Sequence, residues 1–143
     1  MFQFYERQGR LETKLFIGTD QQFLFLFSET PLAPSTPVVS NILPTSVRLT
    51  WFPPGYDGNS PILTYEIEAK KVSDPWTLQE DNINPSGSQI SFLVRKLLPH
   101  TQYQFRVRAV NRIGKGAPSA ASGSIRTLIA GKLAISSPES ACI

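Results

Sequence analysis

The fold is decided by LLPHTQYQFRVRAVNRIGKG, residues 97–116, whose middle part alternates between apolar and polar side chains. Four apolar residues share one parity and three polar residues share the other: Tyr103, Phe105, Val107 and Ala109 against Gln104, Arg106 and Arg108. This period of two is typical of a β-strand with one buried face. A proline-containing turn precedes the alternation, and a loop with Gly114 and Gly116 follows it. The stretch therefore predicts one long strand between a turn and a loop.

Six further segments on either side have the pattern of short strands, and turn formers separate them every eight to twelve residues. They are residues 37–42, 46–52, 63–71, 74–79, 89–94 and 117–127. The 12 prolines of the chain disfavour long helices and suit short strands with turns. Together with the central strand these segments predict an all-β fold, a seven-stranded antiparallel β-sandwich of the immunoglobulin-like kind with irregular flanks.

Three regions of the 143-residue chain differ in character. Residues 33–128 are expected to form the domain, with residues 1–32 as an unassigned N-terminal flank and residues 129–143 as a C-terminal tail. The N-terminal flank shows neither strand alternation nor a helical period, and PLAPSTP, residues 31–37, separates it from the strands. Both flanks are expected to lie outside the sandwich, poorly ordered or loosely attached. QQFLFLF, residues 21–27, has an aggregation-prone composition, and the alternative is that it adds a strand to a sheet edge.

Few residues of this sequence are suited to catalysis. His100 is the only histidine, and the single cysteine, Cys142, lies in the tail, so no intramolecular disulfide can form. Because no carboxylate pair, metal-ligand cluster or phosphate-binding glycine loop is evident, we expect no enzyme activity and no cofactor. The net charge is +3, and residues 33–128 hold ten Lys/Arg against six Asp/Glu, an excess of 10 − 6 = 4 that is small for a nucleic-acid binder. No apolar run approaches the roughly 18 residues of a membrane span.

Residues 33–127 resemble a fibronectin type III domain. The family's tyrosine corner, in which a tyrosine hydroxyl bonds to the backbone a few residues upstream, is matched by Leu97, Pro99, Thr101 and Tyr103. The strand and loop that follow in the family are matched by Phe105, Val107, Ala109, Asn111, Gly114 and Gly116. Trp51 and Tyr65 stand where the family keeps its core aromatics. The resemblance implies a structural core that includes Trp51, Tyr65, Leu97, Tyr103 and Val107.

Within the family, PPGYDGNSPILTYEIEAKK and AVNRIGKG are similar to segments of immunoglobulin-superfamily adhesion proteins of the Sidekick and Down syndrome cell adhesion molecule type. Cytoplasmic titin-like muscle proteins carry related DGGSPI loops. The resemblance implies a non-catalytic protein-interaction or cell-adhesion module, a fragment of a multidomain cell-surface receptor. The alternative is an intracellular scaffold module of the titin type. Expected partners are proteins, through homophilic adhesion or neighbouring domains, and the expected location is the cell surface, although the chain shows no signal peptide, membrane anchor or glycosylation sequon.

Two groups of residues are candidates for binding. Partner-binding loops are expected at Tyr56, Asp57 and Asn59 and at Arg112, Ile113 and Lys115, because loops on a rigid scaffold carry function and the resemblance places these two at the same end of the domain. The alternative is that these loops only make turns or contact a neighbouring domain. A basic patch for heparan sulfate or acidic lipid is the second group: Lys70, Arg95, Arg106 and Arg108.

The alternative to the basic patch is a set of cross-strand ion pairs. The family resemblance implies that two strands are neighbours, one with Arg106 and Arg108 and the other with Glu66 and Glu68. Opposite charges then lie across from one another. Trp76, on the predicted short edge strand, is either a contact aromatic or a cover for the rim of the core.

Overall fold

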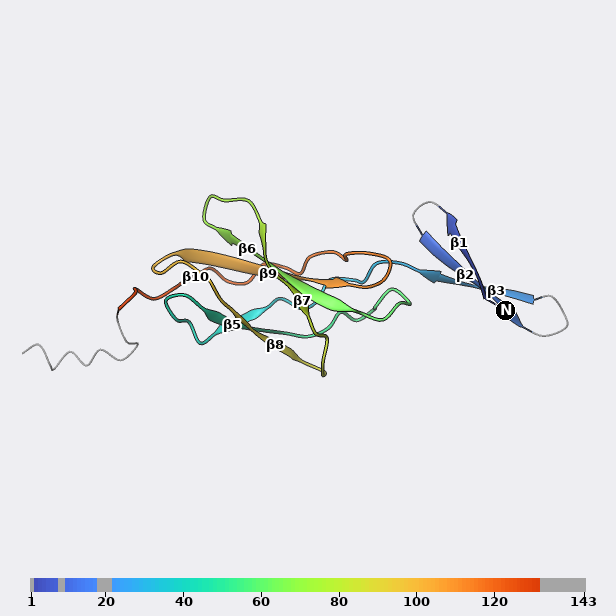
Figure 1. Cartoon of the computed structure of the whole chain (residues 1–143), viewed down its shortest axis with the longest axis horizontal. Helices are drawn as coiled ribbons and strands as arrows, with labels where there is room; N and C mark the ends of the chain where they lie inside the picture. Colours follow the sequence, from blue (N-terminus) through green and yellow to red (C-terminus); the bar gives the residue numbers. More distant parts are fainter. Residues whose placement is uncertain (1, 8–9, 18–21, 132–143) are drawn as a thin grey trace, which may run out of the picture.

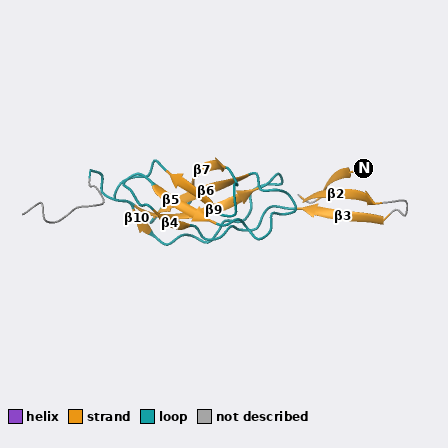
Figure 2. Ribbon diagram, turned by 90° about the horizontal axis from the view of Figure 1, so that it is seen from below, coloured by secondary structure: helices purple, strands orange, loops and turns teal. Residues whose placement is uncertain are grey.

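The computed structural model describes residues 2–7, 10–17 and 22–131, and the surroundings of side chains from residue 27 onward. In this part of the chain seven strands form a sandwich of two antiparallel sheets (Figure 1, Figure 2), as the sequence predicts. The strands are β4 (Val38–Ser40), β5 (Val47–Trp51), β6 (Thr64–Lys71), β7 (Thr77–Ile83), β8 (Ile90–Val94), β9 (Gln102–Val110) and β10 (Ile125–Arg126). One sheet has the order β10-β9-β6-β7 and the other β4-β5-β8.

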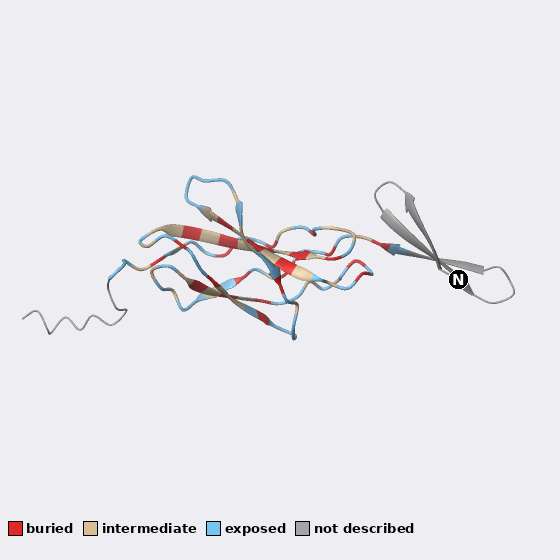
Figure 3. Cartoon of the chain, viewed as in Figure 1, coloured by how far each residue is buried: buried red, intermediate tan, exposed pale blue. Residues whose placement is uncertain are grey.

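The long strand predicted within residues 97–116 is β9, along which every second side chain is buried (Figure 3). It pairs with β6 from Thr64↔Val110 to Lys71↔Tyr103. The five residues expected in the core are each at most 5% exposed: Trp51, Tyr65, Leu97, Tyr103 and Val107. The rings of Trp51 and Tyr65 meet edge to face, with centroids 5.5 Å apart. Burial also raises the pKa of Tyr65 to about 12.

The tyrosine corner forms where the chain turns from β8 into β9. The hydroxyl oxygen of Tyr103 accepts a hydrogen bond from the N–H of Leu98 over 3.0 Å, five residues upstream. The N–H of Leu97 donates to the carbonyl of Thr45 over 3.0 Å and holds the turn against the loop between β4 and β5. The turn is therefore fixed by hydrogen bonds from both sides.

The seventh strand is much shorter than the sequence predicts, because two serines upstream of it make hydrogen bonds to β9 in place of a regular ladder. Residues 117–127 were expected to be a strand, but β10 covers only Ile125–Arg126. Upstream, Ser122 donates its N–H to the carbonyl of Phe105 over 2.7 Å, and its Oγ accepts the N–H of Phe105 over 3.0 Å. Ser119 makes the same two bonds with Val107, at 2.8 and 3.0 Å. Serine hydroxyls thus satisfy β9 amides that a regular ladder would otherwise pair.

Replacing Ser122 with alanine should lower the free energy of unfolding by about 1–2 kcal/mol, since it leaves the buried N–H of Phe105 without a partner. Denaturant unfolding followed by circular dichroism measures the loss. Ser88→Ala is a matched control, because Ser88 is exposed and no hydrogen bond of its hydroxyl is seen among the described residues. Equal midpoints for the two variants would show that the Ser122 hydroxyl is dispensable.

Strand β7 is displaced from its predicted position. Residues 74–79 were expected to form the edge strand, whereas β7 begins at Thr77 and continues to Ile83. Its pairing with β6 shifts register twice, between Tyr65 and Ile67 and between Ile67 and Glu68. Trp76 therefore lies one residue before the strand and outside its ladder with β6.

The expectation of an irregular N-terminal flank is wrong. Three antiparallel strands form there: β1 (Phe2–Arg7), β2 (Arg10–Ile17) and β3 (Gln22–Ser28). They make a sheet beyond one end of the sandwich, and no ladder joins it to either sandwich sheet in the described part of the chain (Figure 1). Residues 23–27 pair with β2, from Phe23↔Phe16 to Phe27↔Glu12, and not with a sandwich edge.

In β3 the alternation is hidden because strand-favouring apolar residues occupy both parities, as in QFLFLFS. In β2, RLETKLFI, polar and apolar residues do alternate, and the sequence interpretation missed this pattern. The predicted C-terminal tail, residues 129–143, is described only as far as residue 131. Cys142 and the expectation for the rest of the tail lie outside the described residues.

Candidate protein-interaction surfaces

The two loops predicted to bind partners meet at one end of the sandwich, and Asn111 holds them together. Its side chain is buried, and Nδ2 donates to the carbonyl of Asp57 in the β5–β6 loop over 2.8 Å. Its Oδ1 accepts the N–H groups of Ile113 and Gly114 over 2.9 and 3.1 Å. One amide therefore shapes both loops. The sequence interpretation gave Asn111 no such role, although an Asn directly after an alternating strand favours a side-chain-stabilised turn.

The six predicted loop residues differ in what they present to solvent. Asp57, Asn59, Arg112 and Lys115 are exposed, and Tyr56 and Ile113 are half-buried. Asn59 has a φ of 53°, and its N–H donates to Oδ1 of Asp57 over 3.0 Å. The side chain of Lys115 extends over the four-stranded sheet, where its Nζ lies 3.0 Å from Oε1 of Glu66 in β6. The loops are therefore held in a defined shape, and Lys115 belongs as much to the sheet face as to its loop.

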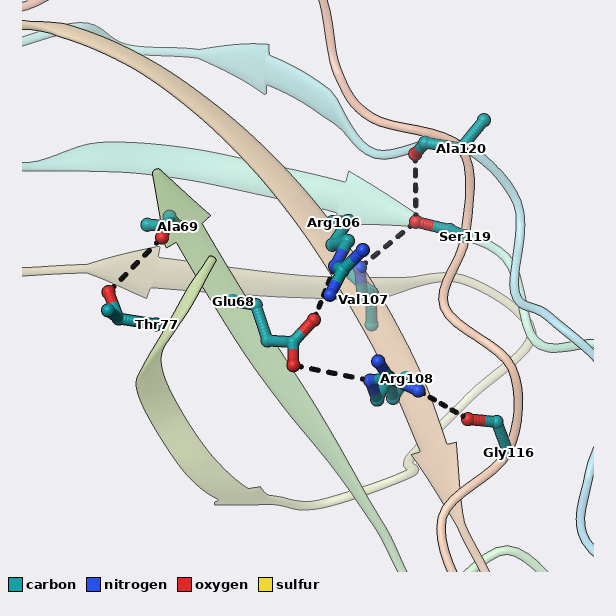
Figure 4. Close-up of polar contacts among 9 residues, drawn as sticks. All are labelled: Glu68, Ala69, Thr77, Arg106, Val107, Arg108, Gly116, Ser119 and Ala120. Carbon is teal, nitrogen blue, oxygen red and sulfur yellow. Dashed lines mark hydrogen bonds and ion pairs between the residues drawn. The ribbon is translucent and has the colours of Figure 1, made fainter. Parts of the chain in front are cut away.

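The solvent-facing side of the four-stranded sheet carries a row of ion pairs (Figure 4). The register places Glu68 opposite Arg106 and Glu66 opposite Arg108, which is the arrangement that the cross-strand alternative predicts. Glu68 bonds to both arginines: Oε2 accepts from Nε of Arg106, and Oε1 accepts from Nε of Arg108 over 3.3 Å. Arg108 also donates to the carbonyl of Gly116 over 3.1 Å. Both guanidinium groups are thus engaged within the sheet.

Trp76 lies over the same face, close to two cations. The guanidinium carbon of Arg106 is 4.4 Å from the ring centroid, and Nζ of Lys70 is 5.2 Å from it. Both distances are within the range in which a cation is attracted to an aromatic face. The indole is half-buried, so this cluster presents a partly exposed aromatic ring within a charged surface. We call Lys70, Trp76, Glu68, Arg106 and Arg108 the ladder face.

The four residues of the predicted anion patch do not form one site. Arg106 and Arg108 bond to Glu68, and Lys70 contacts Trp76. Arg95 lines a separate cavity of about 410 Å³ together with Glu80 and Phe92. Another cavity, of about 300 Å³, opens beside Lys70 and is lined by Lys71 and Lys96. Lys70, Arg106 and Arg108 therefore lie together on the ladder face, Arg95 lies apart from them, and the two arginines of the ladder face are already paired with a carboxylate.

The side chains that could ligate a metal are dispersed over the described residues. Among them, no group of three or more His, Cys, Asp or Glu side chains is placed to hold a metal ion. His100 is exposed at the corner turn, where its Nε2 lies 3.4 Å from a guanidinium nitrogen of Arg126. No helix in the described part of the chain is long and apolar enough to cross a membrane.

Three curated proteins illustrate what the sequence is similar to. Protein sidekick-2 of Mus musculus is 39% identical over 88 residues, which is 60% of this chain and 4% of that protein. Human cell adhesion molecule-related/down-regulated by oncogenes is 38% identical over 96 residues, covering 66% of this chain and 7% of that protein. Human cardiac-type myosin-binding protein C is 39% identical over 109 residues, covering 74% of this chain and 8% of that protein. The chain therefore spans less than a tenth of these relatives.

Solved structures show the same sandwich. The titin kinase with its flanking domains matches with a TM-score of 0.62 and 32% identity, over 70% of this chain and 18% of that one. The FN1-FN3 domains of chicken CNTN1 match with a TM-score of 0.60 and 32% identity, over 70% of this chain and 33% of that one. The family model described as fibronectin type III domain matches residues 32–124, which include six strands of the sandwich, β4 to β9, and end just before β10. This match covers more than half of the sequence, and the chain belongs to the fibronectin type III family.

Proposed function

We propose that this chain is a non-catalytic protein-interaction module and that it comes from a multidomain cell-surface adhesion protein. The observation that carries the proposal is the ladder face, where the half-buried ring of Trp76 contacts both Lys70 and Arg106. Tryptophan and arginine are enriched among the residues that dominate protein–protein binding energy. The similarity to cell adhesion molecule-related/down-regulated by oncogenes and to sidekick-2 supports the adhesion assignment.

The partner that we propose is a second copy of the module, bound through the ladder face. Glu68 already neutralises part of the charge of Arg106 and Arg108 on this face, which lowers the repulsion between the arginines of two copies around the half-buried indole. Such a contact would bury an aromatic ring at its centre and leave ion pairs at its rim.

Trp76→Ala should weaken self-association by about tenfold or more, because truncating a central aromatic of an interface commonly costs about 2 kcal/mol or more. Analytical ultracentrifugation and aggregation of beads coated with the chain measure the effect. Phe52→Ala is the matched control, since Phe52 is an exposed aromatic that directly follows β5 of the three-stranded sheet. Monomeric wild-type protein and dispersed beads would contradict the homophilic contact. Salt-sensitive heparin retention that is lost in Arg106→Ala and Arg108→Ala would instead support the glycosaminoglycan-binding alternative.

A second candidate is a scaffold module inside the cell. It is supported by the similarity to cardiac-type myosin-binding protein C and to the titin kinase structure. The two candidates differ in cellular location, so surface biotinylation of the full-length native product separates them. Labelling of the product on intact cells supports the adhesion module, and labelling only after lysis supports the scaffold module.

A further inference from the structure

The segment that leads into the sandwich, residues 27–32, runs between the two loops that Asn111 holds together. The N–H of Glu29 donates to the carbonyl of Gly58 over 2.8 Å, and the carbonyl of Glu29 accepts Nδ2 of Asn111 over 2.7 Å. The N–H of Leu32 donates to the carbonyl of Tyr56 over 3.1 Å. These bonds involve the backbone of the segment, so they resemble the addition of an extended strand more than a side-chain interface. We call residues 27–32 the lead-in segment.

The first part of the lead-in segment is bonded to Asn59. Its Nδ2 donates to the carbonyl of Phe27 over 2.9 Å, and its own carbonyl accepts the hydroxyl of Ser28 over 3.2 Å. Ser28 is also the last residue of β3. The N-terminal sheet therefore passes directly into the lead-in segment without a free linker between them.

Two glycines make room for the lead-in segment. A Cβ on Gly58 would lie 2.0 Å from the carbonyl oxygen of Glu29, and a Cβ on Gly116 would lie 2.3 Å from that of Pro31. Both distances are far shorter than a non-bonded contact allows. The φ of Gly58 is +81°, which itself favours glycine, but space alone accounts for Gly116. Each loop thus contributes one position at which only glycine lets the backbone of the segment approach.

We infer that this end of the domain is a docking groove for an extended polypeptide segment, occupied by the chain's own lead-in segment. The groove recognises backbone N–H and carbonyl groups, with a small side chain at Ser28 and a buried proline at Pro31. Its role is to fix what precedes the sandwich to the domain. The backbone of the loops predicted to bind an external partner therefore serves as an intramolecular junction, while the side chains of Asp57, Arg112 and Lys115 stay exposed.

The test is amide hydrogen exchange on the full chain, with Gly116→Ala compared with Gly123→Ala. Gly123 is the matched control because a Cβ there would meet nothing within 4 Å. In Gly116→Ala the amides of Glu29 and Leu32 should exchange about tenfold faster or more, while core amides such as Leu49 and Val107 keep their protection. Gly123→Ala should match the wild type at all four positions.

Unchanged exchange at Glu29 and Leu32 in Gly116→Ala would overturn the proposal. If the core amides lose protection as well, Asn59→Gly decides, because glycine tolerates the φ of 53° and only the side-chain bond to Phe27 is removed. Faster exchange confined to the lead-in segment in Asn59→Gly supports the groove, and wild-type exchange there overturns it.

Discussion

Replacing Trp51 with alanine should lower the free energy of unfolding by about 3–5 kcal/mol, the range measured when a buried aromatic is truncated. Trp51 is 1% exposed and lies at the end of β5, where its ring meets the edge of Tyr65. Removal of the indole takes away this ring contact and leaves a cavity between the two sheets. A domain of this size is typically stable by about 5–15 kcal/mol, so the variant is expected to unfold at much lower denaturant concentration.

Denaturant titration followed by far-ultraviolet circular dichroism measures this loss. Phe52→Ala is the matched control, because Phe52 is the next residue along the chain and 54% exposed. Trp51→Phe should cost less than Trp51→Ala, since no partner for the indole N–H is found among the described residues and no hydrogen bond is lost. A loss for Trp51→Ala no larger than that for Phe52→Ala would contradict the sandwich core described above.

The sandwich was predictable from sequence because its strands have one solvent-exposed face and one buried face. In β9 and β6 the alternation of polar and apolar residues survives along most of the strand, and the glycine- and proline-rich loops mark the ends. The same rule fails for β3, in which Phe23 to Phe27 are all apolar, so no period is visible. It also fails for residues 117–124, in which Ser119 and Ser122 replace a ladder by side-chain bonds.

The ladder face followed from the sequence once the register of β6 and β9 was assumed, because Glu66 and Glu68 then oppose the two arginines. Trp76 could be noticed but not placed, since its position depends on where the turn before β7 ends. The docking groove could not be predicted at all. Its bonds join the backbone of residues 27–32 to loops far along the chain, and backbone contacts leave no pattern in side-chain type.

Asn111→Ala is expected to lower the free energy of unfolding by about 2–4 kcal/mol, because several polar groups lose their partner at once. The carbonyls of Glu29 and Asp57 lose the donor Nδ2, and the N–H groups of Ile113 and Gly114 lose the acceptor Oδ1. The side chain is 3% exposed, so water reaches these groups only after the loops have moved apart.

Chemical denaturation of the full chain measures the effect, with Asn84→Ala as the matched control. Asn84 is exposed and makes no hydrogen bond through its side chain within the described residues, so its loss should stay within about 0.5 kcal/mol, as for other surface substitutions. Asn111→Asp keeps an acceptor for the loop amides but turns a carboxylate oxygen toward the carbonyls of Glu29 and Asp57. It should therefore be at least as destabilising as alanine near neutral pH, where the carboxylate is ionised. If Asn111→Asp were as stable as the wild type, the donor side of Asn111 would not hold the loops, and its bonds to the lead-in segment would contribute nothing to stability.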